Sequence, residues 1–318
     1  DLAREIAALP RDEVVDLFRN DPWLANYALN TWEYATGRVA LTTYPWNVHL
    51  PIADICNAGC TFCNSWIRGK RWLEMEELER FAPVLRHARL LGLEGHGEPL
   101  IHPQFEAIAA RMSELVDPRC STYLITNGVH LEKRLDALRR VNVRTFNVSL
   151  NAATPATHDV VMGLGEKAFD RVLAGVRRLL EIRDTADPGL HVNLSLVVLQ
   201  QNVHEVADFV RLGNELGVTN LYVRTLMPVG ALVPGLNYQT LPPSLHPEYA
   251  RHRERALQAI AASRVNVLTS PETWDSPTLG PDALEQLRRD PPPIVSRLEA
   301  RTDQGLQERY ARASALRT

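Results

Sequence analysis

Apolar residues along this chain recur with two alternating periods, which predict short strands followed in turn by amphipathic helices. The pattern begins near residue 46 and repeats six times. The expected strands are 47–55, 90–93, 121–126, 145–150, 191–199 and 220–226, and the expected helices are 75–88, 105–116, 132–141, 169–182 and 203–216. Such alternation predicts a parallel sheet with right-handed crossovers. We therefore expect an α/β fold, a partial (β/α)6 barrel of parallel strands rather than a full barrel of eight units.

The segments on either side of this alternation differ from it. Residues 1–45 predict an N-terminal helical extension, and residues 46–230 the barrel core. Residues 231–318 are expected to form a mainly helical or irregular C-terminal extension that caps the core or faces substrate. Within this extension, 249–262 predicts a helix and 265–268 a possible extra strand.

Composition and charge narrow the class of protein. A chain of 318 residues with 45% hydrophobic and 23% charged residues is typical of a folded globular protein. A formal charge of −3 gives no reason to expect a nucleic acid or an anionic membrane as partner. No apolar run reaches the length of a membrane-spanning helix, and no signal-peptide pattern opens the chain, so a reducing cytoplasm is the expected location.

Three of the four cysteines lie within eight residues, directly after the first expected strand. Cys56, Cys60 and Cys63 have the spacing CxxxCxxC, which can ligate three irons of a [4Fe–4S] cubane and leave the fourth iron open for chemistry. A zinc site with Cys120 as fourth ligand is the rival interpretation, and three unconnected buried cysteines are another. Zinc ligands usually come as two CxxC pairs, and Cys120 begins a strand, at the opposite end of a parallel sheet. The same position makes Cys120 a poor hydrogen-atom donor.

Polar segments follow the next two expected strands. Gly95-His96-Gly97-Glu98-Pro99 contains a glycine turn that allows close approach of backbone to a ligand, and Glu98 could accept hydrogen bonds from an ammonium group. Thr126-Asn127-Gly128 ends the third strand, at the face where barrel enzymes build their sites. Taken alone, each segment is also consistent with an ordinary turn.

Later strands carry further polar candidates. Ser149 and Asn151 close the fourth strand and share one face, although an Asx or Ser/Thr turn would use the same residues. Asn193 and Ser195 alternate together on the fifth strand and either line the barrel or simply pack as polar residues. Arg224, on the sixth strand, either faces substrate or forms a salt bridge within the scaffold.

Together these segments resemble the radical S-adenosylmethionine (SAM) superfamily over about residues 46–230. The matching features are CxxxCxxC with the aromatic Phe62 before the last cysteine, a GGEP-like motif with His96 between the glycines, TNG, and a VSLNAATP segment typical of members with a SPASM or twitch extension. The resemblance implies that the three cysteines hold a [4Fe–4S] cluster whose open iron binds SAM. Reductive cleavage of SAM then gives a 5′-deoxyadenosyl radical that takes hydrogen from a substrate.

The resemblance also implies site residues and a partner. His96, Asn151 and Arg224 are the substrate-side candidates, and Met162 stands where relatives often have an arginine. An electron donor such as flavodoxin or ferredoxin is implied. The expected cofactor-binding residues are Phe62, Gly97, Glu98, Pro99, Thr126, Asn127, Ser149, Ser195 and Met227.

The substrate and the reaction are less closely specified. Relatives with VSLNAATP usually carry further cysteines for auxiliary clusters, and this tail has none. Without a second cluster to accept an electron, redox-neutral outcomes such as epimerisation, dehydration or decarboxylation are favoured. No winged-helix type of peptide-recognition domain is evident, so we expect a small polar substrate: a sugar, aminocyclitol or nucleoside of a natural-product pathway. Peptide or protein modification is the alternative, and a non-catalytic iron–sulfur or zinc-binding protein is the alternative of another class.

Overall fold

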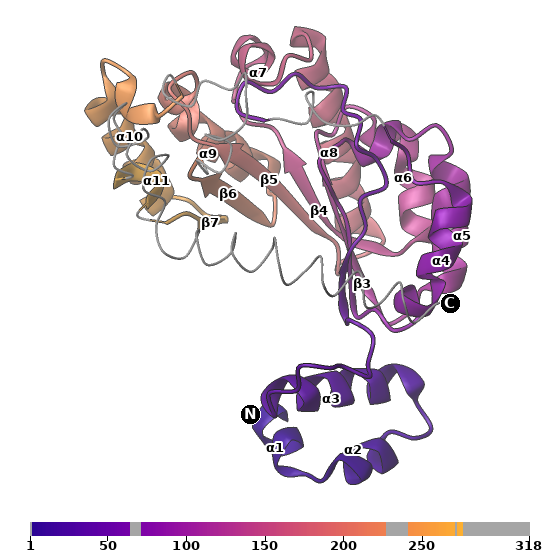
Figure 1. Cartoon of the computed structure of the whole chain (residues 1–318). Coiled ribbons are helices and arrows are strands. Elements are labelled where there is room, and N and C mark those ends of the chain that lie inside the picture. Colours follow the sequence, from indigo (N-terminus) through magenta and orange to yellow (C-terminus); the bar gives the residue numbers. More distant parts are fainter. Residues whose placement is uncertain (1, 64–70, 227–240, 271, 276–318) are drawn as a thin grey trace, which may run out of the picture. The chain divides into compact units, whose positions relative to one another are not determined.

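A computed structural model describes residues 2–63, 71–226, 241–270 and 272–275 (Figure 1). These residues form one sheet of seven parallel strands arranged in sequence order, which confirms the predicted α/β partial barrel. The possible strand at 265–268 is formed and pairs in parallel with the sixth strand, so the sheet extends beyond the six expected units. The strands are β1 (Asn47–His49), β2 (Leu90–Leu93), β3 (Ser121–Thr126), β4 (Val143–Ser149), β5 (His191–Val197), β6 (Asn220–Arg224) and β7 (Asn266–Leu268).

The first strand is shorter than the sequence predicts. We expected it to span 47–55, but β1 ends at His49. The following residues are extended and pair with residues 71–73 instead, through an antiparallel bridge between Ala53 and Trp72. Pro51 lies at the change of partner, where its missing N–H removes a hydrogen bond that a continuous strand would need. The chain is thereby turned out of the sheet just before the cysteines.

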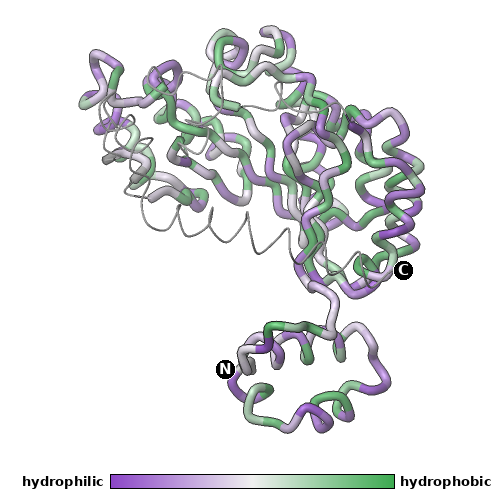
Figure 2. Tube along the Cα trace, viewed as in Figure 1, coloured by the Kyte–Doolittle hydropathy of each residue, from purple (hydrophilic) through white to green (hydrophobic). Residues whose placement is uncertain are grey.

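One layer of helices covers one face of the sheet (Figure 1). Strands in sequential order with crossovers of one hand place every crossover helix on the same side. Hydrophilic and hydrophobic residues alternate along these helices, as expected for elements with one buried side (Figure 2). They are α4 (Met75–Leu85), α5 (Phe105–Leu115), α6 (Leu131–Arg140), α8 (Glu166–Thr185), α9 (Val206–Leu216) and α10 (Tyr249–Ala261).

Shorter helices fill the connections. The α-helices α7 (Pro155–Met162) and α11 (Glu272–Asp275) lie before α8 and after β7. Single 3-10 turns are η1 (Pro99–Ile101), η2 (Val203–Glu205) and η5 (Pro243–Leu245). Of these connections, α7 carries a residue of the candidate site described below, and η1 directly follows another.

The two faces of the sheet differ in character. Strand residues that point toward the helices are apolar and fully buried, among them Leu91, Leu124, Phe146 and Leu194. The alternate residues on the same strands point to the other side, which we call the inner face. Along β4 the inner-face positions are Thr145, Asn147 and Ser149, all partly buried. The inner face is therefore lined largely by polar side chains.

The N-terminal segment folds as three helices around a small core of its own. They are α1 (Leu2–Ala8), α2 (Arg11–Leu17) and α3 (Pro22–Ala35). Asp21 caps α3 by accepting a hydrogen bond from the Leu24 amide at 3.2 Å. The core of this segment consists of Ile6, Val14, Ala28 and Trp32.

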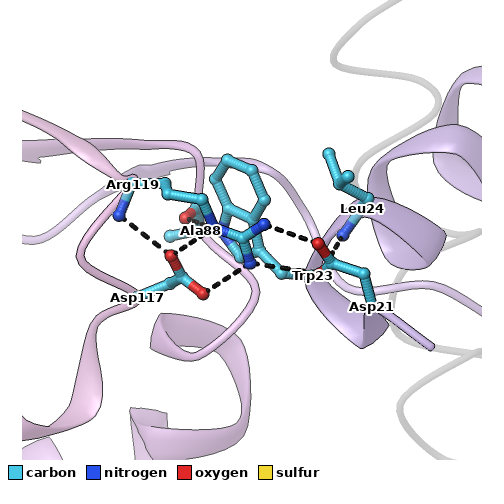
Figure 3. A network of polar contacts seen from close by, with 6 residues as sticks. All are labelled: Asp21, Trp23, Leu24, Ala88, Asp117 and Arg119. Carbon is cyan, nitrogen blue, oxygen red and sulfur yellow. Dashed lines mark hydrogen bonds and ion pairs between the residues drawn. The ribbon is translucent and has the colours of Figure 1, made fainter. Parts of the chain in front are cut away.

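A polar and aromatic network joins these helices to the barrel (Figure 3). Trp23 Nε1 donates a hydrogen bond to the Ala88 carbonyl at 2.8 Å. Arg119 bridges Asp21 and Asp117, and its guanidinium lies 4.3 Å from the centre of the Trp23 ring. Ala88 lies just before β2 and Arg119 lies just before β3, so the contact is made at the amino ends of these two strands.

Residues 1–275 form one compact unit. The predicted division of the chain at residues 45 and 230 stays a prediction.

Candidate active site

A cavity of about 170 Å³ lies at the carboxyl ends of the strands, where parallel α/β folds build their sites. Its lining comes from the loops after β1, β2 and β3, from the ends of β4 and β5, and from α7. The fold therefore gathers candidates that are up to 139 residues apart in sequence, from Cys56 to Ser195. The predicted site residues in this lining are Cys56, Cys60, Phe62, Cys63, His96, Gly97, Glu98, Thr126, Asn127, Ser149, Asn151 and Ser195.

The cysteine loop is held in place by the end of α7. The amides of Gly59 and Thr61 donate to the carbonyls of Met162 and Val161 at 2.9 and 3.0 Å. These carbonyls belong to the last turn of the helix, whose C=O groups lack partners within the helix. The Phe62 ring packs against the apolar cluster that contains Met162. The helix thus fixes the backbone of the segment that contains Cys60.

The GHGEP segment fits against the cysteine loop from the other side. The Gly97 amide donates to the Ala53 carbonyl at 3.1 Å, and the Glu98 amide donates to the Ile55 carbonyl at 2.8 Å. A Cβ atom on Gly97 would lie 2.4 Å from both carbonyl oxygens, which is closer than atoms can approach. We predicted that the glycine serves contact with a ligand. The structure shows that this glycine serves close packing of two loops of the protein, and its contact with a ligand stays a prediction.

Glu98 is a buried carboxylate at the centre of the site, with only 2% of its surface exposed. One oxygen accepts hydrogen bonds from the Thr126 hydroxyl at 2.6 Å and the Leu100 amide at 3.1 Å, and the other accepts from the Asn127 amide at 2.6 Å. Burial raises the pKa of this carboxyl group, although these hydrogen bonds act in the opposite direction. These hydrogen bonds of Glu98 therefore fasten the end of β3 to the GHGEP segment.

Asn127 connects the end of β3 with the cysteine loop. Its Nδ2 donates to the Asn57 Oδ1 at 2.7 Å, and its Oδ1 accepts from the Val129 amide at 3.1 Å. The TNG turn needs a glycine at its third position, because Gly128 has a φ of 79°. Asn57, between the first two cysteines, was not among the predicted site residues, and only its position in the motif pointed to it.

Asn151 and Met162 form a second connection to the cysteine loop. Asn151 is 1% exposed and has a φ of 57°, a left-handed conformation that asparagine tolerates. Its Oδ1 accepts from the Val197 amide at 2.9 Å, and its Nδ2 lies 3.0 Å from the Met162 sulfur. That sulfur lies 3.5 Å from Cys60 Sγ. Met162, the last residue of α7, thus contacts Cys60, a contact that the sequence did not predict.

Ser149 and Ser195 present two hydroxyl groups to the cavity. They are paired residues in the register of β4 and β5, and both are partly buried on the inner face. The Ser195 carbonyl accepts hydrogen bonds from the amides of Leu150 and Asn151, both at 3.1 Å. This pairing fixes the carboxyl ends of the two strands. Their role in binding SAM stays a prediction.

Three predicted site residues do not line this cavity in the described structure. Pro99 is buried as the first residue of η1. Arg224 is exposed at the end of β6, with its guanidinium 4.7 Å from the ring centre of Tyr222. Met227 lies outside the described residues. Cys120 is buried directly before β3, at the amino end of the strand, so it does not join the other three cysteines.

The chemistry of the three thiols fits an iron–sulfur cluster. Burial, and then the neighbouring Cys63 and Cys56, raise the pKa of Cys60 above its ordinary value. A bare Cys60 thiolate is therefore disfavoured, whereas bound metal cations would compensate its charge and deprotonate the thiol. No three His, Cys, Asp or Glu side chains in the described parts of the chain are placed to hold one metal ion. Cluster ligands bind separate irons and need not converge on one point.

Comparison with known families gives the same assignment. A model of the radical SAM superfamily matches residues 50–213, which is more than half of the chain. The chain belongs to the radical SAM superfamily. Members of this superfamily use a [4Fe–4S] cluster and SAM, as the sequence predicted. The matched region runs from the end of β1 into α9 and includes every described residue of the cavity.

Relatives and structural neighbours agree with this assignment. A probable GTP 3′,8-cyclase of Saccharolobus islandicus (strain Y.N.15.51 / Yellowstone #2) is 29% identical over 189 residues, and the GTP 3′,8-cyclase of Aquifex aeolicus is 27% identical over 201. Each alignment covers 58% of this chain and 58% of the relative. Streptococcus suis SuiB bound to S-adenosylmethionine has a TM-score of 0.54 at 16% identity, over 77% of this chain and 56% of SuiB. AdoMet-bound anSMEcpe has a TM-score of 0.54 at 18% identity, over 69% and 62% of the two chains, so the fold is shared.

Among the described helices, none has both the length and the apolar character needed to cross a bilayer.

Proposed function

We propose that this chain is a radical SAM enzyme that acts on a small polar molecule, such as a sugar, an aminocyclitol or a nucleoside, and brings about a redox-neutral change. The bound cluster and SAM would supply the radical that removes hydrogen from the substrate. The residues of the chain would bind and orient both ligands. Cys56, Cys60 and Cys63 hold the cluster, while Ser149 and Ser195 face the cavity in which SAM would lie.

The polar inner face of the sheet is the observation that carries the proposed substrate class. Four asparagines form a ladder across neighbouring strands, in register from β4 to β7. The amide of Asn193 donates to Asn147 at 2.9 Å, that of Asn220 to Asn193 at 2.8 Å, and that of Asn266 to Asn220 at 2.8 Å. Parallel strands covered on both faces are apolar on both. A continuous row of amides is suited instead to a wet cavity that receives a polar ligand.

The number of cysteines supports a redox-neutral outcome. The sequence has one cysteine beyond the motif, Cys120, and the structure places it in the core at the amino end of β3. An auxiliary cluster near the cavity would need further ligands from outside this sequence. We therefore propose a single cluster, reduced by a flavodoxin or ferredoxin in the cytoplasm. A hydrogen atom would then be returned to the substrate radical, with or without prior loss of a leaving group.

Stimulation of SAM cleavage tests this proposed substrate class. The reconstituted protein is incubated with SAM and dithionite, and 5′-deoxyadenosine is measured with and without panels of sugars, aminocyclitols, nucleosides and peptides. We expect a member of the small polar panels to increase its formation. Asn193→Leu should reduce that increase, because it breaks the ladder at a position that is 1% exposed. Asn20→Leu, at an exposed position of the N-terminal segment, is the control. Stimulation by peptides alone would contradict the proposal.

A further inference from the structure

We propose that Tyr123 is a catalytic hydrogen-atom donor on the inner face of the sheet, with Glu94 and His49 as the groups that position its phenol and return a proton to it. This inference rests on the proposed redox-neutral reaction, because a substrate radical that is not oxidised must receive a hydrogen atom. Nothing in the cluster motif or in the SAM-site motifs assigns a role to either residue.

Tyr123 lies deeper in the sheet than the candidate SAM site, on the same face. It precedes Ile125 by two residues on β3, and Ile125 lines the cavity. Two residues of a strand span about 6.6 Å, so the phenol belongs to the layer directly behind the cavity. Glu94, at the end of β2, likewise precedes His96 of the cavity by two residues. A substrate on the inner face would thus have the SAM site on one side and Tyr123 on the other.

The surroundings of the phenol are arranged to hold it across β2. A Cβ atom on Gly92 would lie 2.5 Å from Cζ and Oη of Tyr123, so only glycine leaves space for the ring. The Tyr123 hydroxyl donates to Glu94 Oε1 at 2.8 Å and lies 3.1 Å from His49 Nδ1. His49 and Glu94 also contact each other directly. Three polar groups from β1, the end of β2 and β3 therefore meet at one point on the inner face.

Phenols and thiols are the side-chain groups whose X–H bonds are weak enough to yield hydrogen to a carbon radical. Burial, and then the hydrogen bond to Glu94 and its charge, raise the pKa of Tyr123, so the resting phenol keeps its proton. Cys120 points into the core beneath the helices. Tyr222 is the other inner-face phenol on the described strands, and the Arg224 guanidinium lies over its ring.

The proposed step balances in atoms and electrons. The O–H bond of Tyr123 breaks homolytically and a C–H bond forms on the substrate radical, which leaves a neutral tyrosyl radical. One electron from the protein that also reduces the cluster, and one proton returned through Glu94 and His49, restore the phenol. Glu94 and His49 are positioning and proton-transfer residues in this scheme.

Deuterium transfer and electron paramagnetic resonance (EPR) test the assignment without an identified substrate. The reconstituted protein is incubated with SAM and dithionite in D2O, where the phenol exchanges its proton. No substrate then lies between the SAM site and Tyr123, so the 5′-deoxyadenosyl radical takes deuterium from the phenol directly. We expect singly deuterated 5′-deoxyadenosine. Freeze-quenched samples should show a tyrosyl EPR signal whose hyperfine splitting changes when the tyrosines are ring-deuterated.

Variants decide whether Tyr123 is the source. Tyr123→Phe should lose both the deuterium and the EPR signal, and Gly92→Ala should weaken both by displacing the phenol. Tyr222→Phe, the matched control, should keep both. Product without deuterium from the wild type, or an unchanged signal in Tyr123→Phe, would overturn this inference and leave the proposed function intact. No 5′-deoxyadenosine from wild-type protein with a full cluster would overturn the proposed function instead.

Discussion

At the scale of single residues, Gly97 controls how closely the GHGEP segment packs against the cysteine loop. We expect Gly97→Ala to bind less iron per chain after reconstitution and to lose about 1–3 kcal/mol of unfolding free energy, because its Cβ would meet the Ala53 and Ile55 carbonyls. Iron analysis and urea unfolding measure these effects. Gly59→Ala is the control, since a Cβ there would meet no described atom within 4 Å. Equal iron content in the two variants would contradict this account.

Glu98 supplies the second prediction at this scale. Glutamine has one acceptor oxygen in place of two, so Glu98→Gln would leave a donor at Thr126 or Asn127 facing an NH2 group. An unmade hydrogen bond at a buried site costs about 1–3 kcal/mol, and we expect a loss of stability of that size in urea unfolding. Glu132→Gln, on the exposed side of α6, should change stability little. Equal effects of the two substitutions would mean that Glu98 does not fasten β3.

The sequence predicted most of the cavity residues, but it did not predict what they contact. Cys56, Asn127 and Ser149 line the cavity as expected, because motifs at the carboxyl ends of parallel strands meet in space. The contact of Met162 with Cys60 depends on how α7 packs, and spacing along the chain does not contain that information. For the same reason the sequence identifies Tyr123 only as part of a strand.

At the scale of elements, the sequence predicted the later strands and the helices of the barrel better than it predicted the first strand. The bounds of β2 and β3 match the prediction, because alternating or continuous apolar runs end there at clear turn signals. The strand expected at 47–55 ends at His49. The residues after it are apolar whether they continue the strand or leave the sheet, so the sequence does not show that they pair with residues 71–73 instead. β7 was predicted only as a possible strand, and pairing with β6 stabilises it.

The joint between the N-terminal helices and the barrel gives a prediction with a defined pH dependence. The hydrogen bond to Arg119 lowers the pKa of Asp21 from 3.8 to about 2. A lowered pKa in the folded state stabilises the fold fully above pH 3.8, and this contribution is lost as the pH falls from 3.8 toward about 2. We therefore expect Asp21→Asn to be less stable than wild type at pH 5 to 7, and the difference to vanish near pH 2.

Hydrogen exchange gives a second measurement of the same joint. Arg119→Met should speed amide exchange in α1 to α3, because it removes both ion pairs and the cation–π contact with Trp23. Arg140→Met, exposed at the end of α6, is the matched control. Unchanged exchange in the N-terminal helices of Arg119→Met would show that other contacts hold the joint.

At the scale of the whole molecule, the fold separates its functions by position along the strands. The amino ends of β2 and β3 contact the N-terminal helices, and the carboxyl ends form the cavity. Helices cover the apolar face, while the inner face keeps its asparagines and the Tyr123–Glu94 pair. The substrate could not be predicted from the sequence, because the motifs describe the cofactor site, which radical SAM enzymes share. This chain covers 58% of the length of the probable GTP 3′,8-cyclase of Saccharolobus islandicus.

The central claim, that three cysteines of this chain hold a cluster that cleaves SAM, is tested most directly by one anaerobic assay. Wild type, Cys60→Ala and the control Cys120→Ala are reconstituted with iron and sulfide, incubated with SAM and dithionite, and assayed for 5′-deoxyadenosine by mass spectrometry. We predict product from wild type and Cys120→Ala, and neither cluster nor product from Cys60→Ala. A fully reconstituted wild type that forms no 5′-deoxyadenosine, or a Cys60→Ala variant that forms as much as wild type, would contradict the claim.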